Sequence, residues 1–492
     1  MVKSVVGEET RLQFAENRLF QSNLLAQVGL VVGKLSSGLD RGFVYDLVPT
    51  APTDDGRLPC SLPEIVGGSG RDDKRKGSKG GGGKSPAEAP APLIIDVDWV
   101  AEHARQVARL LLGGMHVVGI YVWTSESSFK ASSLVLWQTV REVAQATPFY
   151  ENDPQERLLV HASYSPRRWT CRNCILASTN VSTNLRPCDF KWGKLLGSLQ
   201  LFRCIYKFDQ RLPIIGGPKN EAFKDVLREA ISDQRKELKN CTKALIDGKL
   251  VNEDLQCILE GTHEVELLLP FMNKVSSYAF KEEEIVGLLV FTGVIHASAY
   301  LCPKETVSEA ISEVKEDIIN SLQSRLEIIC EEAGLTDSSV SSSIESEKET
   351  SFDGVNCQSI LNMLKFNCTL SFPRRVLIPW LGNVFVCDYL QPSETLEVLG
   401  SHCGEMMAME SPIDNKSVLE VEKEVASLTI RSFWDAALGR SAPLADCSGR
   451  HGADQRSGGS ESKGSSSSSL IAIAVLLFAI LVGWIITRTL VH

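Results

Sequence analysis

The sequence predicts an α/β (α+β) protein with two mixed-sheet domains and one transmembrane helix near its C-terminus. Strand-like apolar runs alternate with amphipathic helical patterns through most of the 492 residues, which is typical of helices packed on a mixed sheet. A hydrophobic content of 43% with 23% charged residues is that of ordinary globular domains. An uncharged apolar run, Leu470–Ile486, lies close to the end of the chain and predicts the membrane span.

The first domain is predicted at residues 1–215. A helix at 12–27 is followed by two strands, 28–34 and 42–50, which a Gly-containing turn joins. Residues 51–92 are rich in Gly, Lys, Ser and Pro. We expect them to form a disordered insertion, because this composition buries too little apolar surface to offset the entropy lost on ordering.

The rest of this domain continues the alternation of helix and strand. The expected elements are a helix from Asp96 that Gly113 and Gly114 end, a strand at 116–124, a helix at 127–146, a strand at 158–163, and strand-like runs near 170–178 and 195–208.

A charged amphipathic helix at 216–247 is expected to connect the two domains, and the second domain is predicted at 248–438. Residues 285–301 are rich in β-branched residues and glycine, so two strands are favoured there over a marginal membrane span. Further elements follow: a helix at 306–333, an acidic Ser-rich loop at 337–351, a helix near 359–364, a strand near 368, two strands within 373–390 about Gly382, and a helix at 418–433.

Residues 439–469 are Gly- and Ser-rich and predict a flexible tether to the membrane. The predicted span, 470–486, is long enough for a thin bilayer and includes Leu470, Phe478, Trp484 and Ile486. A buried helix would normally keep a polar face, and this run has none. Few residues follow it, so it inserts after translation ends, which predicts a tail anchor with the bulk of the chain in the cytosol. Arg488 alone lies close behind it, and this favours the endoplasmic reticulum over the mitochondrial outer membrane.

Composition also bears on partners and redox state. A net charge of −10 argues against nucleic-acid binding by the body of the protein. The 14 cysteines are expected to be reduced, because the N-terminus lacks the apolar core of a signal peptide.

One cysteine pattern invites a metal site. Cys171 and Cys174 form a C-x-x-C pair, and Cys188 and Cys204 follow it. A structural zinc site usually shows a second close pair, so reduced structural thiols are the favoured interpretation. We expect no metal and no cofactor.

The segment Val117–Val135 resembles the centre of the MPN domain, whose zinc-dependent members cleave ubiquitin-like conjugates. Those members carry H-x-H, seven residues, then S-x-x-D. Aligned on this chain, the metal-site positions fall on Val122, Thr124, Ser132 and Val135, and only the serine matches. Valine cannot coordinate zinc, so the resemblance implies a first domain that is MPN-like but lacks the metal site. The fold expected for the body of the protein is two MPN-like mixed-sheet domains. Without that resemblance, the segment is a core strand and helix.

The chain as a whole resembles the odorant-response-abnormal-four (ODR-four-like) family. The most specific part of the match is Pro373, Arg374, Arg375, Pro379, Trp380, Cys387, Asp388 and Tyr389. The resemblance implies an endoplasmic-reticulum membrane protein that supports maturation and trafficking of seven-helix receptors. It also implies a partner, the ubiquitin-fold-modifier-specific cysteine protease, which such proteins place at the membrane.

The favoured function is therefore a non-catalytic, membrane-tethered adaptor. Three alternatives stay open: an MPN-like hydrolase acting on ubiquitin-like conjugates, a tail-anchored trafficking factor without a protease partner, and a tail-anchored fusion protein. The last should show heptads running into the anchor, whereas a Gly/Ser-rich tether intervenes.

Overall fold

The computed structural model describes most of the chain up to residue 432. The described ranges are 2–36, 38–63, 91–148, 156–177, 184–215, 223–240, 243–251, 261–268, 285–340, 369–409, 416–419, 421–422 and 426–432. Both predicted globular domains belong to one compact unit, Met1–Gly439. The helix expected near 359–364, the tether from 439 and the anchor at 470–486 lie outside the described residues. Among the helices that the structure does describe, none has the length and apolarity needed to cross a membrane.

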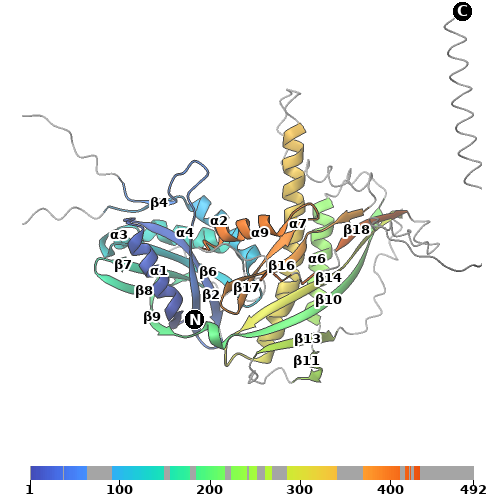
Figure 1. Cartoon of the computed structure of the whole chain (residues 1–492), viewed down its shortest axis with the longest axis horizontal. Helices are drawn as coiled ribbons and strands as arrows, with labels where there is room; N and C mark the ends of the chain where they lie inside the picture. The colour runs from blue at the N-terminus through green and yellow to red at the C-terminus, as the bar shows by residue number, and fades with distance from the viewer. Residues whose placement is uncertain are drawn as a thin grey trace, which may run out of the picture. The chain divides into compact units, whose positions relative to one another are not determined.

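A closed barrel forms the N-terminal half of the unit (Figure 1). Its strand order is β1-β3-β2-β6-β7-β8-β9, and β1 closes it by pairing parallel with both β3 and β9. The strands are β1 (Ser4–Glu8), β2 (Gln27–Ser36), β3 (Arg41–Pro49), β6 (His116–Thr124), β7 (Glu156–Tyr164), β8 (Arg167–Ile175) and β9 (Leu185–Gly193). The predicted hairpin and the predicted strand at 116–124 are confirmed; β1 and β9 were not predicted.

Helices pack against this barrel. They are α1 (Glu9–Gln21), α2 (Val97–Leu110), α3 (Glu126–Ala131) and α4 (Ser133–Ala146). The Asp96 side chain caps α2 by accepting a hydrogen bond from the Trp99 amide at 3.1 Å. The single helix predicted at 127–146 is divided at Ser132, whose hydroxyl donates to the Ser128 carbonyl and accepts from the Leu93 amide.

The predicted disorder of residues 51–92 is wrong for its first part. Cys60 and Ser61 form β4 (Cys60–Ser61), which pairs antiparallel with β5 (Ile94–Ile95). The Cys60 side chain is buried in the same core as the barrel helices. This pairing joins segments distant in sequence, so local composition did not reveal it. Residues 64–90 lie outside the described residues.

A second sheet has the order β12-β11-β13-β10-β14-β18-β15. Its strands are β10 (Gln200–Ile215), β11 (Lys243–Ile246), β12 (Lys249–Leu250), β13 (Thr262–Leu268), β14 (Ile285–Leu301), β15 (Thr369–Ser371) and β18 (Ser427–Ser432). Two long strands, β10 and β14, run side by side in antiparallel register from Gln200 opposite Leu301 onward (Figure 1).

Three predictions for this region need correction. The run at 285–301 is one strand rather than two, because β10 pairs with it over its whole length. The segment predicted as a helix at 418–433 contains β18, whose Leu428 lies between Phe291 and Leu370 of neighbouring strands. The domain boundary predicted at 215/216 would separate β10 from the sheet to which it belongs; the sheets divide between β9 and β10.

Two helices pack with this second sheet. The expected connecting helix at 216–247 is α6 (Phe223–Asn240), and its Leu227, Ile231 and Leu238 are buried in the second core, so it is a packed element rather than a connector. The long helix α7 (Val307–Val340) buries Val314, Ile318 and Leu322 in the same core.

A separate hairpin, β16 (Arg374–Leu381) and β17 (Val384–Leu390), turns at Gly382 as predicted. Although it follows the second sheet in sequence, its apolar residues share a core with α2 of the barrel domain. The helix α9 (Leu396–Met406) follows it. The hairpin therefore bridges the two sheets.

Candidate functional site

The family-motif arginine, Arg375, is buried at the junction of the two sheets. Its guanidinium donates to both carboxylate oxygens of Asp317 at 2.6 and 2.9 Å. The same carboxylate accepts from the backbone amides of Gly113 at 3.1 Å and Ser298 at 2.8 Å. Burial alone would lower the pKa of Arg375, but Asp317 raises it well above its ordinary value. One ion pair thus holds the hairpin, α7, β14 and the barrel loop together.

A second buried carboxylate, Glu422, lies beside this pair. It accepts from the backbone amides of Arg375 at 2.6 Å and His296 at 3.1 Å, and it pairs with the Arg325 guanidinium. The Nε of Arg325 donates to the Pro373 carbonyl at 2.9 Å. Each charged group has several partners, although the Nη1 of Arg325 and the Nε of Arg375 have none within the described residues. Removing any one partner would leave an uncompensated charge in low-dielectric surroundings.

Tyr389 completes the cluster. It is the cross-strand partner of Arg375 in the hairpin, and its ring lies 6.0 Å from that guanidinium and 5.4 Å from the one of Arg325. Burial raises the pKa of Tyr389 to about 12. Pro373, Arg375 and Tyr389 are therefore brought together by the structure.

The other motif residues lie apart from this cluster. The Cys387 thiol donates to the Arg109 carbonyl of α2 at 3.5 Å, and Asp388 pairs with His402 of α9 at 2.8 Å. Arg374, Pro379 and Trp380 are half-buried along β16. The motif residues therefore mark a structural junction.

The positions aligned with the MPN metal site lie at the end of β6 and on the helices after it. Val122 and Thr124 are fully buried, Ser132 is buried at the break between α3 and α4, and Val135 is half-buried against the barrel core. Beside them, the Nε2–H group of His161 donates to the Thr124 carbonyl at 3.1 Å, and the imidazole stacks on the Phe129 ring with centroids 4.0 Å apart.

Burial lowers the pKa of His161 to about 4, so this imidazole is neutral at neutral pH. In the sequence, the only sign that His161 is a buried, neutral histidine is its position in an apolar strand.

The four cysteines considered for zinc are divided between the sheets. Cys171 lies opposite Cys188 in the β8–β9 ladder, and Cys174 lies three residues further along β8, opposite Leu185. Cys204 belongs to β10 and to the second core. Across the described ranges, no three His, Cys, Asp or Glu side chains form a group suited to a metal ion.

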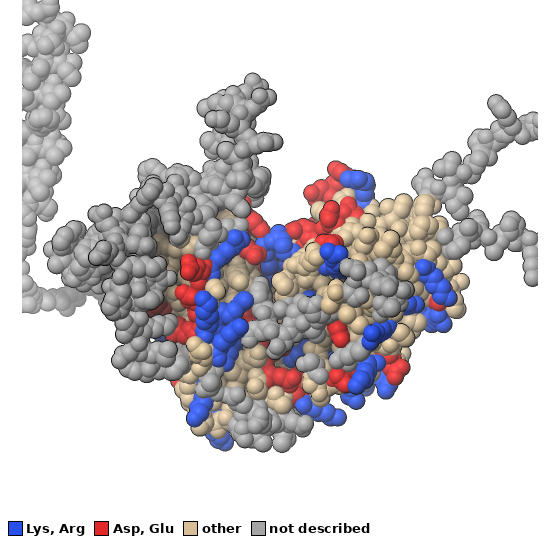
Figure 2. All heavy atoms as spheres, turned by 180° about the vertical axis from the view of Figure 1, so that it is seen from behind, with Lys and Arg blue, Asp and Glu red and all other residues tan. Residues whose placement is uncertain are grey.

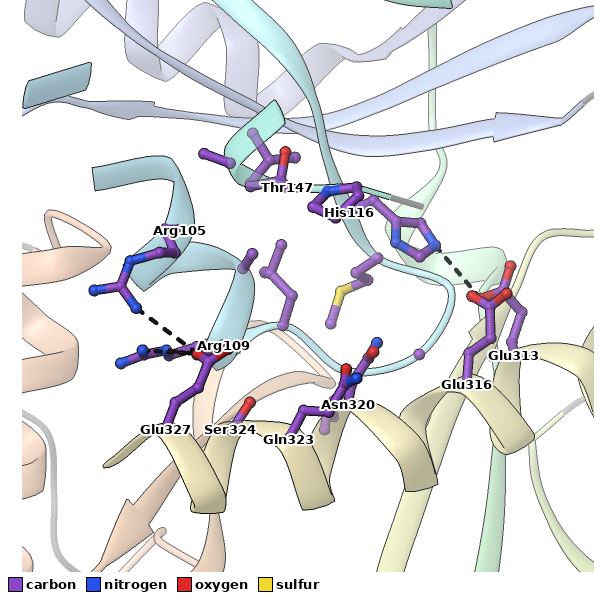
Figure 3. A pocket seen from close by; sticks show the side chains of 18 residues that line it. Arg105, Arg109, His116, Thr147, Glu313, Glu316, Asn320, Gln323, Ser324 and Glu327 are labelled. Atoms are coloured by element: carbon purple, nitrogen blue, oxygen red, sulfur yellow. Dashed lines mark hydrogen bonds and ion pairs between the residues drawn. The ribbon is translucent and has the colours of Figure 1, made fainter. Parts of the chain in front are cut away.

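A pocket of about 300 Å³ lies between the barrel domain and α7 (Figure 3). Its barrel wall is largely apolar, with Leu111, Leu112 and Met115 from the loop between α2 and β6. Its other wall is one face of α7, and the residues there are Glu313, Glu316, Asn320, Gln323, Ser324 and Glu327.

Ion pairs occupy both ends of the pocket. At one end, Arg109 of α2 contacts Glu327 at 2.8 Å and Glu331 at 2.6 Å. At the other, Glu313 lies 3.4 Å from His116 (Figure 3), and its carboxylate is also 3.0 Å from the Lys34 amine. Burial alone would raise the pKa of Glu313, but Lys34 and His116 lower it well below its ordinary value.

The middle of the α7 wall has no such partners. Glu316 forms no ion pair or hydrogen bond within the described residues, and the buried side-chain oxygens of Asn320 and Gln323 accept none there either. Burial and then the charge of Glu313 raise the pKa of Glu316, and the weaker influences of His116, Arg235 and Lys34 do not reverse this.

Sequence reasoning missed the charged residues of α7. A signal was present: Asp317, Ser321 and Arg325 recur every four residues on a helix whose neighbouring positions are apolar. A stripe of polar residues beside the apolar face of a helix predicts that these polar side chains have buried hydrogen-bond or ion-pair partners. It does not predict which distant residues are the partners.

The charged surface does not show a broad basic patch on the face seen in Figure 2. Lys and Arg side chains are interspersed there with Asp and Glu. This agrees with the net charge of −10.

The family model described as "ODR4-like: Odorant response abnormal 4-like" matches residues 29–418. Relatives named "Protein odr-4 homolog" include one of Xenopus laevis, 24% identical over 68% of this chain and 73% of that protein. The one of Homo sapiens is 24% identical over 66% and 72% of the two chains, and the one of Dictyostelium discoideum is 22% identical over 82% and 79%.

Among solved structures, this chain is similar to the crystal structure of UfSP from C. elegans. The alignment covers 85% of this chain and 60% of that chain at 8% identity, with a TM-score of 0.37. An overlap of this size establishes no common fold.

Proposed function

This chain belongs to the odorant response abnormal 4-like family, and from that membership we propose that it is a non-catalytic adaptor at the endoplasmic-reticulum membrane. The match over residues 29–418 is the observation that carries the proposal. The adaptor recruits a ubiquitin-fold-modifier-specific cysteine protease and supports maturation and trafficking of membrane receptors, seven-helix receptors among them.

The absence of catalysis is part of the proposal. It is supported by the side chains at Val122, Thr124 and Val135, which cannot act together as zinc ligands. In this function the barrel domain is an MPN-like domain in which a buried strand and a neutral His161 stand in the place of the metal centre.

Membrane attachment in this proposal comes from residues 470–486 as a tail anchor, with the body facing the cytosol. The apolar run that includes Leu470, Phe478, Trp484 and Ile486 supports it. Confining a weakly bound protease to a membrane raises its encounter rate with membrane-bound substrates without any new contact.

The test is the location of the protease in cells with and without this protein. We expect the modifier protease to co-purify with the full-length chain from detergent-solubilised membranes, and to leave the membrane fraction when the chain is deleted. A protease that stays membrane-bound after deletion would refute recruitment. Cleavage of a ubiquitin-like conjugate by the purified chain alone, or one tightly bound zinc per chain, would instead support a hydrolase.

A further inference from the structure

In the middle of the pocket beside α7, three side chains have acceptor oxygens to which no described residue donates a hydrogen bond. Glu316, Asn320 and Gln323 lie four and then three residues apart, so they share one face of the helix. Neighbouring side chains at these spacings are about 5–6 Å apart. The three residues therefore form a row of acceptors parallel to the helix axis.

The chemistry of this row selects the ligand. A carboxylate and two amide oxygens require a group that donates hydrogen bonds, and the carboxylate favours one with positive charge. Metal ions are less suited, because Mg²⁺ is usually bound through carboxylates and keeps several waters, which an apolar wall would not accommodate.

The opposite wall restricts the ligand further. Leu111, Leu112 and Met115 present aliphatic surface across from the acceptors, so methylene groups would be buried against them. A pocket of about 300 Å³ is at the lower limit for small-molecule sites, so the ligand is a slender one.

We propose that this pocket binds a linear aliphatic polyamine along α7. Its amines, separated by three or four methylenes, would each face one acceptor of the row formed by Glu316, Asn320 and Gln323. The methylenes would lie against Leu111 and Met115. Ion pairs at both ends, Arg109 with Glu327 and Lys34 with Glu313, already occupy those two carboxylates, so the row between them sets the length of the polycation that fits.

The direct test is calorimetric titration of the purified full-length chain with spermidine at physiological ionic strength. We expect one saturable site, with putrescine weaker because it has fewer amines. Glu316→Gln should weaken spermidine binding about tenfold, because a hydrogen bond to a charged group contributes about that much. Gln323→Met, which keeps the side-chain length and removes the acceptor, should weaken it several-fold.

Glu229→Gln is the matched control. It removes the same charge from an exposed position on α6 that does not line the pocket. We expect unchanged spermidine affinity for this variant, and unchanged thermal unfolding for all three. The proposal is overturned if Glu229→Gln and Glu316→Gln lose the same amount of spermidine affinity, because the binding is then general charge attraction. Complete displacement of spermidine by Mg²⁺ at constant ionic strength would show the same.

Discussion

Arg375 and Asp317 form a two-point ion pair with both side chains buried, although 58 residues separate them in the chain. Asp317 also accepts hydrogen bonds from two backbone amides, Gly113 in the loop before β6 and Ser298 in β14, so the pair connects parts of the fold as well as satisfying its own charges.

Loss of one member of this pair should be strongly destabilising. Asp317→Asn leaves the Arg375 charge buried without a counterion, and we expect the free energy of unfolding to fall by about 3–5 kcal/mol. Guanidinium chloride unfolding of the fragment 1–439 measures this. Asp233→Asn, in an exposed pair with Lys236, should change it by less than about 1 kcal/mol. Similar losses in both variants would mean that the buried pair is not a structural junction.

Gly114 should tolerate no side chain. It has a φ of +75°, and a Cβ there would lie 1.9 Å from the Tyr300 carbonyl oxygen. Gly114→Ala therefore combines backbone strain with a backbone clash, and we expect a loss of at least about 3 kcal/mol in the free energy of unfolding.

The comparison for this variant is Gly382→Ala, where φ is also positive but nothing lies within 4 Å of the added atom. Strain alone predicts a loss of about 1–2 kcal/mol. If the two alanine variants unfold at the same denaturant concentration, then the barrel loop at Gly114 does not pack as closely against β14 as in this structure.

His161 should make the protein less stable in mild acid. Its pKa is lowered to about 4, so between about pH 6.5 and pH 4 the unfolded state binds a proton that the folded state does not. Stability should therefore fall as pH decreases, by about 1.4 kcal/mol per pH unit from this group. Denaturant unfolding at several pH values, in wild type and His161→Gln, isolates the contribution.

His402 provides a control of opposite sign. The hydrogen bond that His402 donates to the Asp388 carboxylate raises the pKa of His402. Its stabilising contribution is therefore present below the unfolded-state pKa and is lost as pH rises through the folded-state pKa. In His402→Gln, this loss of unfolding free energy with rising pH should disappear.

If His161→Gln and wild type show the same slope of unfolding free energy against pH between about pH 6.5 and pH 4, His161 is not the source of that slope.

The proposed anchor predicts a simple change of fractionation. Removing residues 470–492 should release a folded, soluble protein, because these residues contain the predicted membrane span. Flotation of the full-length and truncated chains with sealed membranes measures this. Asn180 and Asn367 lie in N-x-Ser/Thr sequons, so their glycosylation in the full-length chain would contradict a cytosolic body. Flotation of the truncated chain would show that residues 470–492 are not the main attachment.

Local sequence patterns were sufficient for several elements. The strand at 116–124 and the hairpin about Gly382 were predicted because apolar periodicity and a turn residue act over neighbouring positions. The mixed α/β class and the family were also recognisable from the sequence. The motif residues of β16 and β17 were identified, but their shared role at a junction was not.

What the sequence determined is therefore the class of elements, most of their positions and the family. Only the tertiary structure decided that β10 belongs to the second sheet, that residues 427–432 form a strand, and that Asp317, Arg325 and Glu422 surround Arg375. Strand pairing and buried ion pairs join residues far apart in the chain. Their free energy depends on which segments meet and on the exclusion of water there, and neither is encoded in any local window of residues.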